Sequence, residues 1–135
     1  MTKHDLFEEP LTRSVIGAFY DVYNTLGYGF LEHLYVSALE RELSWRGYQV
    51  GREVNVPVVY KGFDLGKQRL DMIVNGTLVV EVKSSHDLPV IASRQLYNYL
   101  RATNLRLGLL LHFGPKPRFY RVFREGSDAQ VRASR

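Results

Sequence analysis

Three ionisable residues, Asp71, Glu81 and Lys83, interrupt a stretch, residues 70–83, that otherwise predicts two buried strands. Burying a carboxylate or an ammonium without a partner is expensive, so three such groups in one apolar hairpin need an explanation. Glu81 and Lys83 are two residues apart, so their side chains leave the same face of one strand. We interpret the group as a metal-dependent site that cleaves phosphodiesters. The alternative is a strand whose polar residues face water.

The turn between the two strands decides whether Asp71 can reach Glu81. An Asn-Gly pair at positions 75–76 is a strong hairpin signal, and it usually closes a two-residue loop. That loop would point Asp71 away from Glu81. A three-residue loop over residues 74–76 would instead place Asp71 diagonal to Glu81 on one face of the sheet. A shared site therefore requires the longer loop, or a bulge that has the same effect.

Composition indicates an ordinary soluble globular protein. The 135 residues are 45% hydrophobic and 24% charged, and 18 basic against 14 acidic residues give a net charge of 18 − 14 = +4. This balance permits a nucleic-acid partner without demanding one. We expect a single domain over residues 1–124 and a disordered polar tail over residues 125–135.

The chain contains no cysteine, which excludes disulfides and thiolate metal sites. A reducing cytoplasm is therefore the expected location. The N-terminal residues lack the apolar run of a signal peptide, and no stretch approaches the ~20 apolar residues that a membrane span needs. We expect no association with a membrane.

Two helices are predicted before the strands. Apolar residues recur at helical spacing over residues 10–26 and again over residues 31–43. Glu32 lies near the start of the second helix and borders its apolar stripe. There it could simply complement the positive end of the helix dipole. It becomes a site residue only if the helix lies across the sheet and aims Glu32 at Asp71.

Extended segments follow the helices. Residues 48–60 alternate between apolar and other side chains, and Pro57 indicates an edge strand or a bulge because proline cannot donate to a ladder. Residues 61–64 are expected to form a turn before the central hairpin.

The second half of the chain predicts a βαβ unit. Its parts are a strand over 77–83, a helix over 89–102 and a strand over 105–113 that is nearly all apolar and therefore buried on both faces. The two strands should be parallel with a right-handed crossover, and a last strand follows at 119–123. The order of elements predicts an α/β fold in which helices flank a mixed central sheet.

Several short motifs, taken in order, resemble those of one protein family. They are Gly29-x-x-Glu32-x-x-Tyr35, Asp71, Glu81-Val82-Lys83, Gln95-x-x-x-Tyr99 and the apolar strand Leu107-Gly108-Leu109-Leu110-Leu111. Over about residues 15–123 this set resembles the small bacterial GxxExxY proteins of the PD-(D/E)XK nuclease superfamily. Two positions depart from the pattern. Leu70 replaces the proline of the superfamily's name, and His112 stands where asparagine is expected, so the role of that position is open.

The resemblance implies a restriction-endonuclease-like α-β-β-β-α-β core and a nuclease that depends on Mg²⁺, with Mn²⁺ as a substitute. Mg²⁺ is a hard cation that prefers oxygen ligands. The implied ligands are Asp71, Glu81, the carbonyl of Val82 and Glu32. The implied catalytic set is Glu32, Asp71, Glu81, Lys83 and Gln95. In that set Lys83 would hold the attacking water and offset the charge that develops on the phosphate.

The resemblance also implies a nucleic-acid partner. DNA is the expected substrate, RNA stays open, and a homodimer is compatible with the pattern. The residues expected to contact substrate are Tyr99, Arg94, Arg69 and His86. A scattered set of basic residues could form a phosphate-contacting rim if folding brings them to one side, and the alternative is a solvated surface: Lys61, Lys67, Arg69, Arg94, Arg101, Arg118 and Arg121.

Each motif has a structural alternative. Glu81 and Lys83 could be a surface pair that contributes ~0–1 kcal/mol, while Gln95 and Tyr99 could be ordinary packing residues of a helix. Two rival functions follow. One is an inactive nuclease-fold module that binds nucleic acid or a protein partner, and the other is a domain whose polar cluster only organises the core.

Overall fold

The computed structural model describes residues 10–125. Its elements are, in chain order, α2 (Pro10–Leu26), α3 (Glu32–Trp45), β1 (Val50–Tyr60), β2 (Phe63–Val74), β3 (Leu78–Lys83), α4 (Ala92–Thr103), β4 (Leu107–Phe113) and β5 (Pro117–Phe123). The tail predicted to be disordered, residues 125–135, lies outside the described residues except for its first position. Within the described range, no helix combines the length and the apolar character needed to cross a bilayer.

One mixed sheet holds all five strands in the order β1-β2-β3-β4-β5. Only β3 and β4 run parallel, and the other neighbours are antiparallel. Helix α4 connects the two parallel strands, so the predicted βαβ unit is confirmed. Strand β1 lies at the edge of the sheet, which explains how it accommodates Pro57. The predicted α/β fold with a mixed sheet and flanking helices is therefore confirmed.

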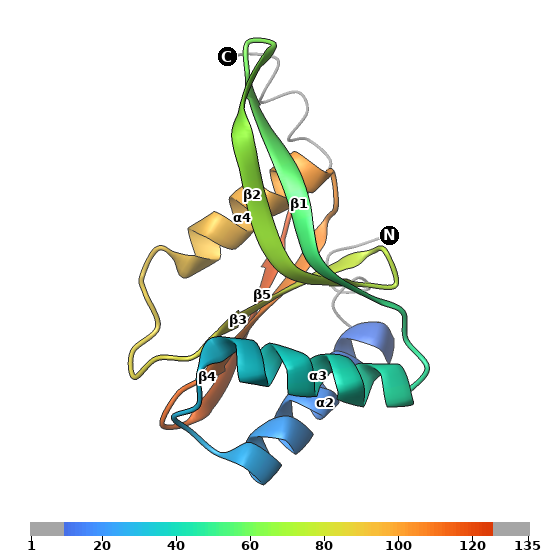
Figure 1. Ribbon diagram of the computed structural model, residues 1–135, viewed down its shortest axis with the longest axis vertical. Coiled ribbons are helices and arrows are strands. Elements are labelled where there is room, and N and C mark those ends of the chain that lie inside the picture. Colours follow the sequence, from blue (N-terminus) through green and yellow to red (C-terminus); the bar gives the residue numbers. More distant parts are fainter. Residues whose placement is uncertain (1–9, 126–135) are drawn as a thin grey trace.

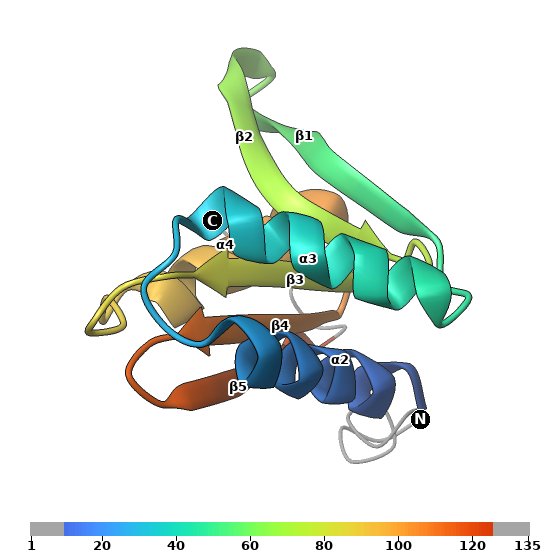
Figure 2. The ribbon, with the colours of Figure 1, turned by 60° about the horizontal axis from the view of Figure 1, so that its bottom comes forward.

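The helices form a layer on each face of the sheet. Helices α2 and α3 lie together on one face, and α4 lies behind the sheet in the view of Figure 2. The core is correspondingly divided into two clusters of buried side chains. The α2/α3-side cluster includes Phe19, Tyr35, Val80 and Phe113, and the α4-side cluster includes Leu96.

Strand β4 is buried along its whole length, as its apolar sequence predicts. Gly108 in this strand lets α4 approach closely, because a Cβ at this position would lie only 3.0–3.1 Å from three atoms of the Leu96 side chain. Glycine thus allows a large leucine to pack directly on the strand backbone.

A stack of aromatic rings fixes the beginning of α3. The ring of Tyr35 stacks on Phe113 of β4, with the ring centroids 4.1 Å apart. Its hydroxyl donates a hydrogen bond to the carbonyl of Gly27 (2.6 Å) and accepts one from the backbone N–H of Phe30 (3.2 Å). Because Glu32 lies on the turn that precedes Tyr35, the same contacts hold Glu32 in place.

Strand β1 lies within the predicted segment 48–60, whereas β2 is longer than the sequence predicts, and the two strands form an arm that rises from the body of the molecule (Figure 1). The predicted turn over residues 61–64 is confined to Lys61 and Gly62, and β2 already begins at Phe63. Residues 64–69 are mostly polar and exposed, so they show no apolar alternation from which the sequence could predict this extension.

The loop between β2 and β3 has three residues, but they are shifted by one from the expected loop. Val74 pairs with Leu78, so the loop is 75–77 rather than 74–76. A long-range contact explains the shift. The N–H of Asn75 donates to the carbonyl of Gln49 (2.8 Å), and the side-chain oxygen of Asn75 accepts the N–H of Gln49 (2.9 Å).

Helix α4 begins at Ala92, three residues later than the predicted start at residue 89. A single turn precedes it, in which the N–H of Ala92 donates to the carbonyl of Pro89 (3.0 Å). No side chain caps the helix; Ser85 instead donates its hydroxyl to the carbonyl of Asp87 (2.7 Å). The segment before α4 is therefore a loop of its own at the end of β3.

Candidate functional site

Asp71 and Glu81 meet where β2 and β3 separate. The ladder between these strands stops at the pair Met72 and Val80. Beyond that pair the N–H of Asp71 donates to Oε1 of Glu81 (3.0 Å), and the N–H of Val82 donates to Oδ2 of Asp71 (2.8 Å). Each carboxylate thus takes the place of a backbone acceptor. Continuing the register puts Asp71 directly opposite Glu81. The two residues are close, as expected, but the expected diagonal placement was wrong.

Strand β2 twists sharply at Asp71. Leu70 belongs to the α4-side cluster, whereas Met72 belongs to the α2/α3-side cluster, although alternate residues of a regular strand share a face. Opposite this point in β1, Glu53 has a left-handed backbone (φ 53°) between the pairs that flank it. Such a conformation costs a non-glycine residue roughly 1 kcal/mol or more. The two strands are therefore distorted together where the carboxylates lie.

Charge repulsion and burial dominate the electrostatics of the pair. Glu81 is only 7% exposed, and burial together with the neighbouring Asp71 raises its pKa to about 8. Burial also raises the pKa of Asp71, against a hydrogen bond from Val82 and the charge of Lys83. Lys83 is half-buried and lowers both pKa values, yet it makes no ion pair within 4 Å in the part of the chain that the structure describes. Without a further cation, Glu81 is protonated at neutral pH.

Glu32 joins this group from α3. The residue as a whole is exposed, but its carboxylate accepts the N–H of Ser84 at the end of β3 (3.3 Å). Desolvation of that carboxylate and the charge of Asp71 raise its pKa, and Lys83 opposes the shift. The hydroxyl of Ser84 also donates to the carbonyl of Phe30 (2.6 Å), so two bonds tie the start of α3 to the end of β3. The structure therefore brings Glu32 to the site, as the sequence pattern suggested.

A small cavity of about 190 Å³ lies beside these groups. Its lining includes Glu32, Asp71 and Arg69, together with Arg52 and Glu53 from β1. Sequence reasoning had placed Arg69 near the substrate, and here it lies at the mouth of the site. The cavity gives solvent and small ions access to the Asp71 carboxylate.

The donor set suits a hard divalent cation. Two carboxylates that repel one another and a nearby third offer oxygen ligands and excess negative charge, which Mg²⁺ would neutralise. Within residues 10–125, however, no three acidic or imidazole groups lie close enough to form a cation site by themselves. Mg²⁺ commonly keeps several waters and uses one or two carboxylates, so Asp71 and Glu81 with the Val82 carbonyl fit it without a third close ligand.

The remaining predicted residues make no hydrogen bond to the carboxylates or to Lys83 among residues 10–125. The Gln95 side chain makes no hydrogen bond to another residue in that range, so its catalytic role stays a prediction. The hydroxyl of Tyr99 accepts a bond from Gln68 of the arm (3.1 Å), and the ring packs on the α4-side cluster. Arg94 lies over the ring of Tyr97. The substrate contacts expected of Tyr99 and Arg94 stay predictions.

His86 makes no hydrogen bond or ion pair with Glu32, Asp71 or Glu81. It is exposed and pairs with Asp87 (3.2 Å) in the loop after β3, where it lines a different cavity. Its expected substrate contact stays a prediction as well.

Sequence reasoning missed Arg52 of β1. Its guanidinium binds Glu40 of α3 (2.8 Å), and its charge lowers the pKa of Asp71. The alternation of β1 gave no signal for this role, because the twist at Glu53 and the position of α3 decide where Arg52 points.

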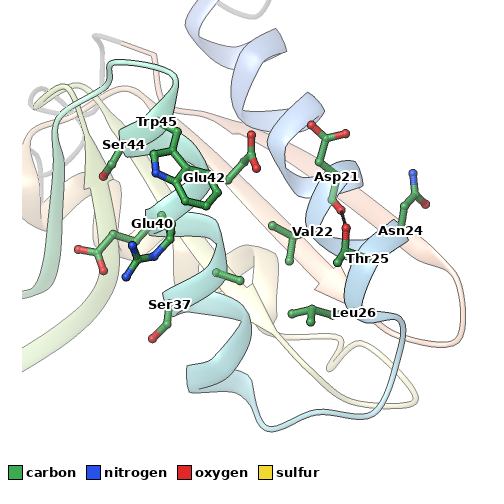
Figure 3. Close-up of a pocket in the computed structure, with 12 residues that line it drawn as sticks. Asp21, Val22, Asn24, Thr25, Leu26, Ser37, Glu40, Glu42, Ser44 and Trp45 are labelled. Atoms are coloured by element: carbon green, nitrogen blue, oxygen red, sulfur yellow. Dashed lines mark hydrogen bonds between the residues drawn. The ribbon is translucent and has the colours of Figure 1, made fainter.

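A larger groove lies elsewhere in the molecule. It lies between α2 and α3, with Val22 and Trp45 among its lining residues (Figure 3), and its volume is about 940 Å³. None of the predicted site residues lines it. This groove is therefore separate from the carboxylate group.

Comparisons with known proteins agree with the geometry. The family model described as the PD-(D/E)XK nuclease superfamily matches residues 9–122. No curated protein matches the chain. The solved structure titled "Crystal structure of SSO0001" is similar with a TM-score of 0.57 at 23% identity; the alignment covers 93% of this chain and 63% of that one. An alkaline exonuclease, LHK-Exo, from Laribacter hongkongensis aligns with a TM-score of 0.43 at 12% identity, over 98% of this chain and 76% of that one. The chain thus spans less than two thirds of SSO0001, and that likeness supports the restriction-endonuclease-like fold.

The raised pKa of Glu81 predicts how stability depends on pH. Its carboxyl group ionises near 4.5 in the unfolded chain and at about 8 in the folded chain. Since the folded state holds the proton more tightly, the free energy of unfolding should fall as pH rises from about 4.5 to about 8 and then level off. Each pKa unit is worth roughly 1.4 kcal/mol. The Glu81→Gln variant, which keeps the acceptor for Asp71, should lose most of this fall and exceed the wild type in stability at pH 8.

Urea denaturation at pH 5 and pH 8 without divalent cations measures the effect. Glu125→Gln, at an exposed position, is the matched control and should follow the wild type. A smaller slope should remain in Glu81→Gln because the pKa values of Asp71 and Glu32 are also raised. Identical pH profiles for the wild type and Glu81→Gln would show that Glu81 is not a strained acid.

Proposed function

Since this chain belongs to the PD-(D/E)XK nuclease superfamily, we propose that it is a Mg²⁺-dependent nuclease that hydrolyses phosphodiester bonds in DNA. One observation carries the proposal. Asp71 and Glu81 come from separate strands to the point where the ladder opens, and burial together with the charge of Asp71 raises the pKa of Glu81 to about 8. Two carboxylates that repel one another beside an accessible cavity do not stabilise a fold, so a cluster that only organised the core would not need them.

The side chains have distinct roles in this proposal. Asp71, Glu81 and the carbonyl of Val82 would hold the ion, with Glu32 contributing directly or through water. A bound Mg²⁺ supplies charge neutralisation at the phosphate and lowers the pKa of water. Lys83 would orient the attacking water and offset the negative charge that develops on the phosphate oxygens. In the reaction, the water oxygen forms a bond to phosphorus, and the opposite phosphorus–oxygen bond breaks as the leaving oxygen takes up a proton.

We further propose that the chain is a GxxExxY-type member of the superfamily. The motif residues Gly29, Glu32 and Tyr35 have connected functions that support this assignment. Tyr35 anchors the start of α3 through Gly27 and Phe113, and Glu32 then reaches Ser84 beside the carboxylates. The spacing of the motif thus matches one turn of helix that carries an acid to the site.

Calorimetric titration with Mg²⁺ tests the metal site. The wild type should bind the ion, and Asp71→Asn should bind it at least tenfold more weakly, because the variant removes a charge while its amide oxygen can still accept the Val82 N–H. Asp64→Asn, the same substitution in the exposed part of β2, is the control and should bind like the wild type. Absence of binding to the wild type, or equal binding to Asp71→Asn, would favour a cluster that only organises the core.

Cleavage assays test the chemistry. With single-stranded, duplex and branched DNA and with RNA as substrates, the wild type should cut at least one DNA form when Mg²⁺ or Mn²⁺ is present. Lys83→Gln should retain Mg²⁺ binding and lose about 10²–10³-fold in rate, as expected when a charge-stabilising donor is removed. Lys61→Gln, in the turn between β1 and β2, should cut like the wild type.

The same assays separate the alternatives. If the wild type binds Mg²⁺ and nucleic acid but cuts no substrate, the chain is an inactive nuclease-fold module. Cleavage of RNA alone would retain the mechanism and replace the substrate.

A further inference from the structure

A second cavity opens beside the proposed nuclease site, at the carboxyl ends of the parallel strands β3 and β4. Figures 1 and 2 both show the loop after β3 next to the turn between β4 and β5, near the start of α3. The cavity has a volume of about 490 Å³, and its polar lining consists of His86, Asp87, His112, Lys116, Arg118 and Tyr120. In α/β sheets, ligands commonly bind outside the carboxyl ends of parallel strands.

A row of basic side chains connects this cavity with the carboxylates. Lys83 pairs with His112 across β3 and β4, and His112 pairs with Arg118 across β4 and β5. Residues that are directly paired share a face of the sheet, and neighbouring strands are about 4.8 Å apart. Arg118 is therefore on the order of 10 Å from Lys83, which is within a few nucleotides along a bound strand.

His112 is built into the wall of the cavity. It is 3% exposed, and its Nε2 lies 2.8 Å from the carbonyl oxygen of Ser85, so Nε2 donates the hydrogen bond and holds the loop after β3 against β4. A Cβ on Gly114 would come within 2.6 Å of the His112 ring, so glycine is needed there to admit the imidazole. The other ring nitrogen, Nδ1, is buried with no hydrogen-bond partner among residues 10–125. In a neutral ring that donates through Nε2, Nδ1 is an acceptor and does not bind an anion, so His112 shapes the cavity wall and does not contact the ligand.

The charge of the lining selects an anion. Lys116 and Arg118 are exposed at the cavity, and neither makes an ion pair with a carboxylate of the described residues. The acidic group of the lining, Asp87, is almost fully exposed and pairs with His86. Among residues 10–125, the cavity lining thus has two cations without an acidic partner and one carboxylate, which lies 3.2 Å from the His86 ring.

We propose that this cavity is a phosphate subsite, which takes a backbone phosphate of the nucleic-acid strand a few nucleotides from the bond that is cut. The inference rests on the proposed function for its substrate class. Lys116 and Arg118 bind the phosphate, while His112 is a positioning residue that holds the Ser85–Asp87 segment in place. The subsite would fix the strand so that the scissile phosphate lies over Asp71 and Glu81.

Titration of the full chain with inorganic phosphate tests the subsite directly, with the histidine ring signals observed by NMR. In the wild type, phosphate should shift the signals of His86 and His112. The double variant Lys116→Gln/Arg118→Gln should need at least fivefold more phosphate for the same shift. Arg121→Gln, on the same strand as Arg118 but on its other face, is the matched control and should titrate like the wild type.

A second measurement carries the inference to nucleic acid. Without divalent cations, the double variant should bind a DNA oligonucleotide more weakly, and the slope of log affinity against log salt should fall by about 1 for each lost phosphate contact. An unchanged slope, or phosphate shifts that are equal in the wild type and the double variant, would overturn the subsite. The two proposals can fail separately. Phosphate binding without any DNA cleavage would overturn the nuclease and retain the anion site. Equal cleavage rates in the wild type and the Lys116→Gln/Arg118→Gln variant would overturn the subsite and retain the nuclease.

Discussion

Two carboxylates hold β2 and β3 together at the point where these strands part. Asp71 and Glu81 each accept a backbone N–H from the opposite strand, so they close the hairpin with side chains in place of a ladder. The arrangement satisfies the backbone groups but leaves the buried Glu81 carboxyl beside the half-buried Asp71 carboxyl. A proton on Glu81 relieves the repulsion in the free protein, and a divalent cation can relieve it in the same way. Stability and candidate chemistry thus depend on one interaction.

Helices on both faces of the sheet support the distorted region around Asp71. On one face, Tyr35 stacks on Phe113 and fixes the start of α3, which brings Glu32 to the end of β3. On the other face, Gly108 lets α4 pack tightly through Leu96. The parallel strands β3 and β4 then end side by side, with Lys83 beside the carboxylates. Rigid packing around the site explains how the distortion at Asp71 is tolerated.

Local signals in the sequence predicted most of the fold, because apolar periodicity, glycines and prolines act over a few residues. They could not predict features that distant residues decide. The hairpin loop is set by Gln49 bonding to Asn75, and the direction of Arg52 follows from a twist in β1. For Glu32, helix position alone left a dipole role open, and only the ordered set of motifs indicated a site. Tyr99 shows the opposite case, since its place in a motif did not reveal that its hydroxyl bonds to Gln68.

The central claim is that Asp71 and Glu81 form a strained acidic pair that a divalent cation relieves. Titration of the side-chain carboxyl carbons by NMR, with and without Mg²⁺, tests it most directly. The Glu81 carboxyl should titrate at about 8 in the absence of divalent ions, and saturating Mg²⁺ should lower that pKa well below neutrality. A Glu81 carboxyl that titrates near its ordinary value of 4.5, with no response to Mg²⁺, would contradict the account.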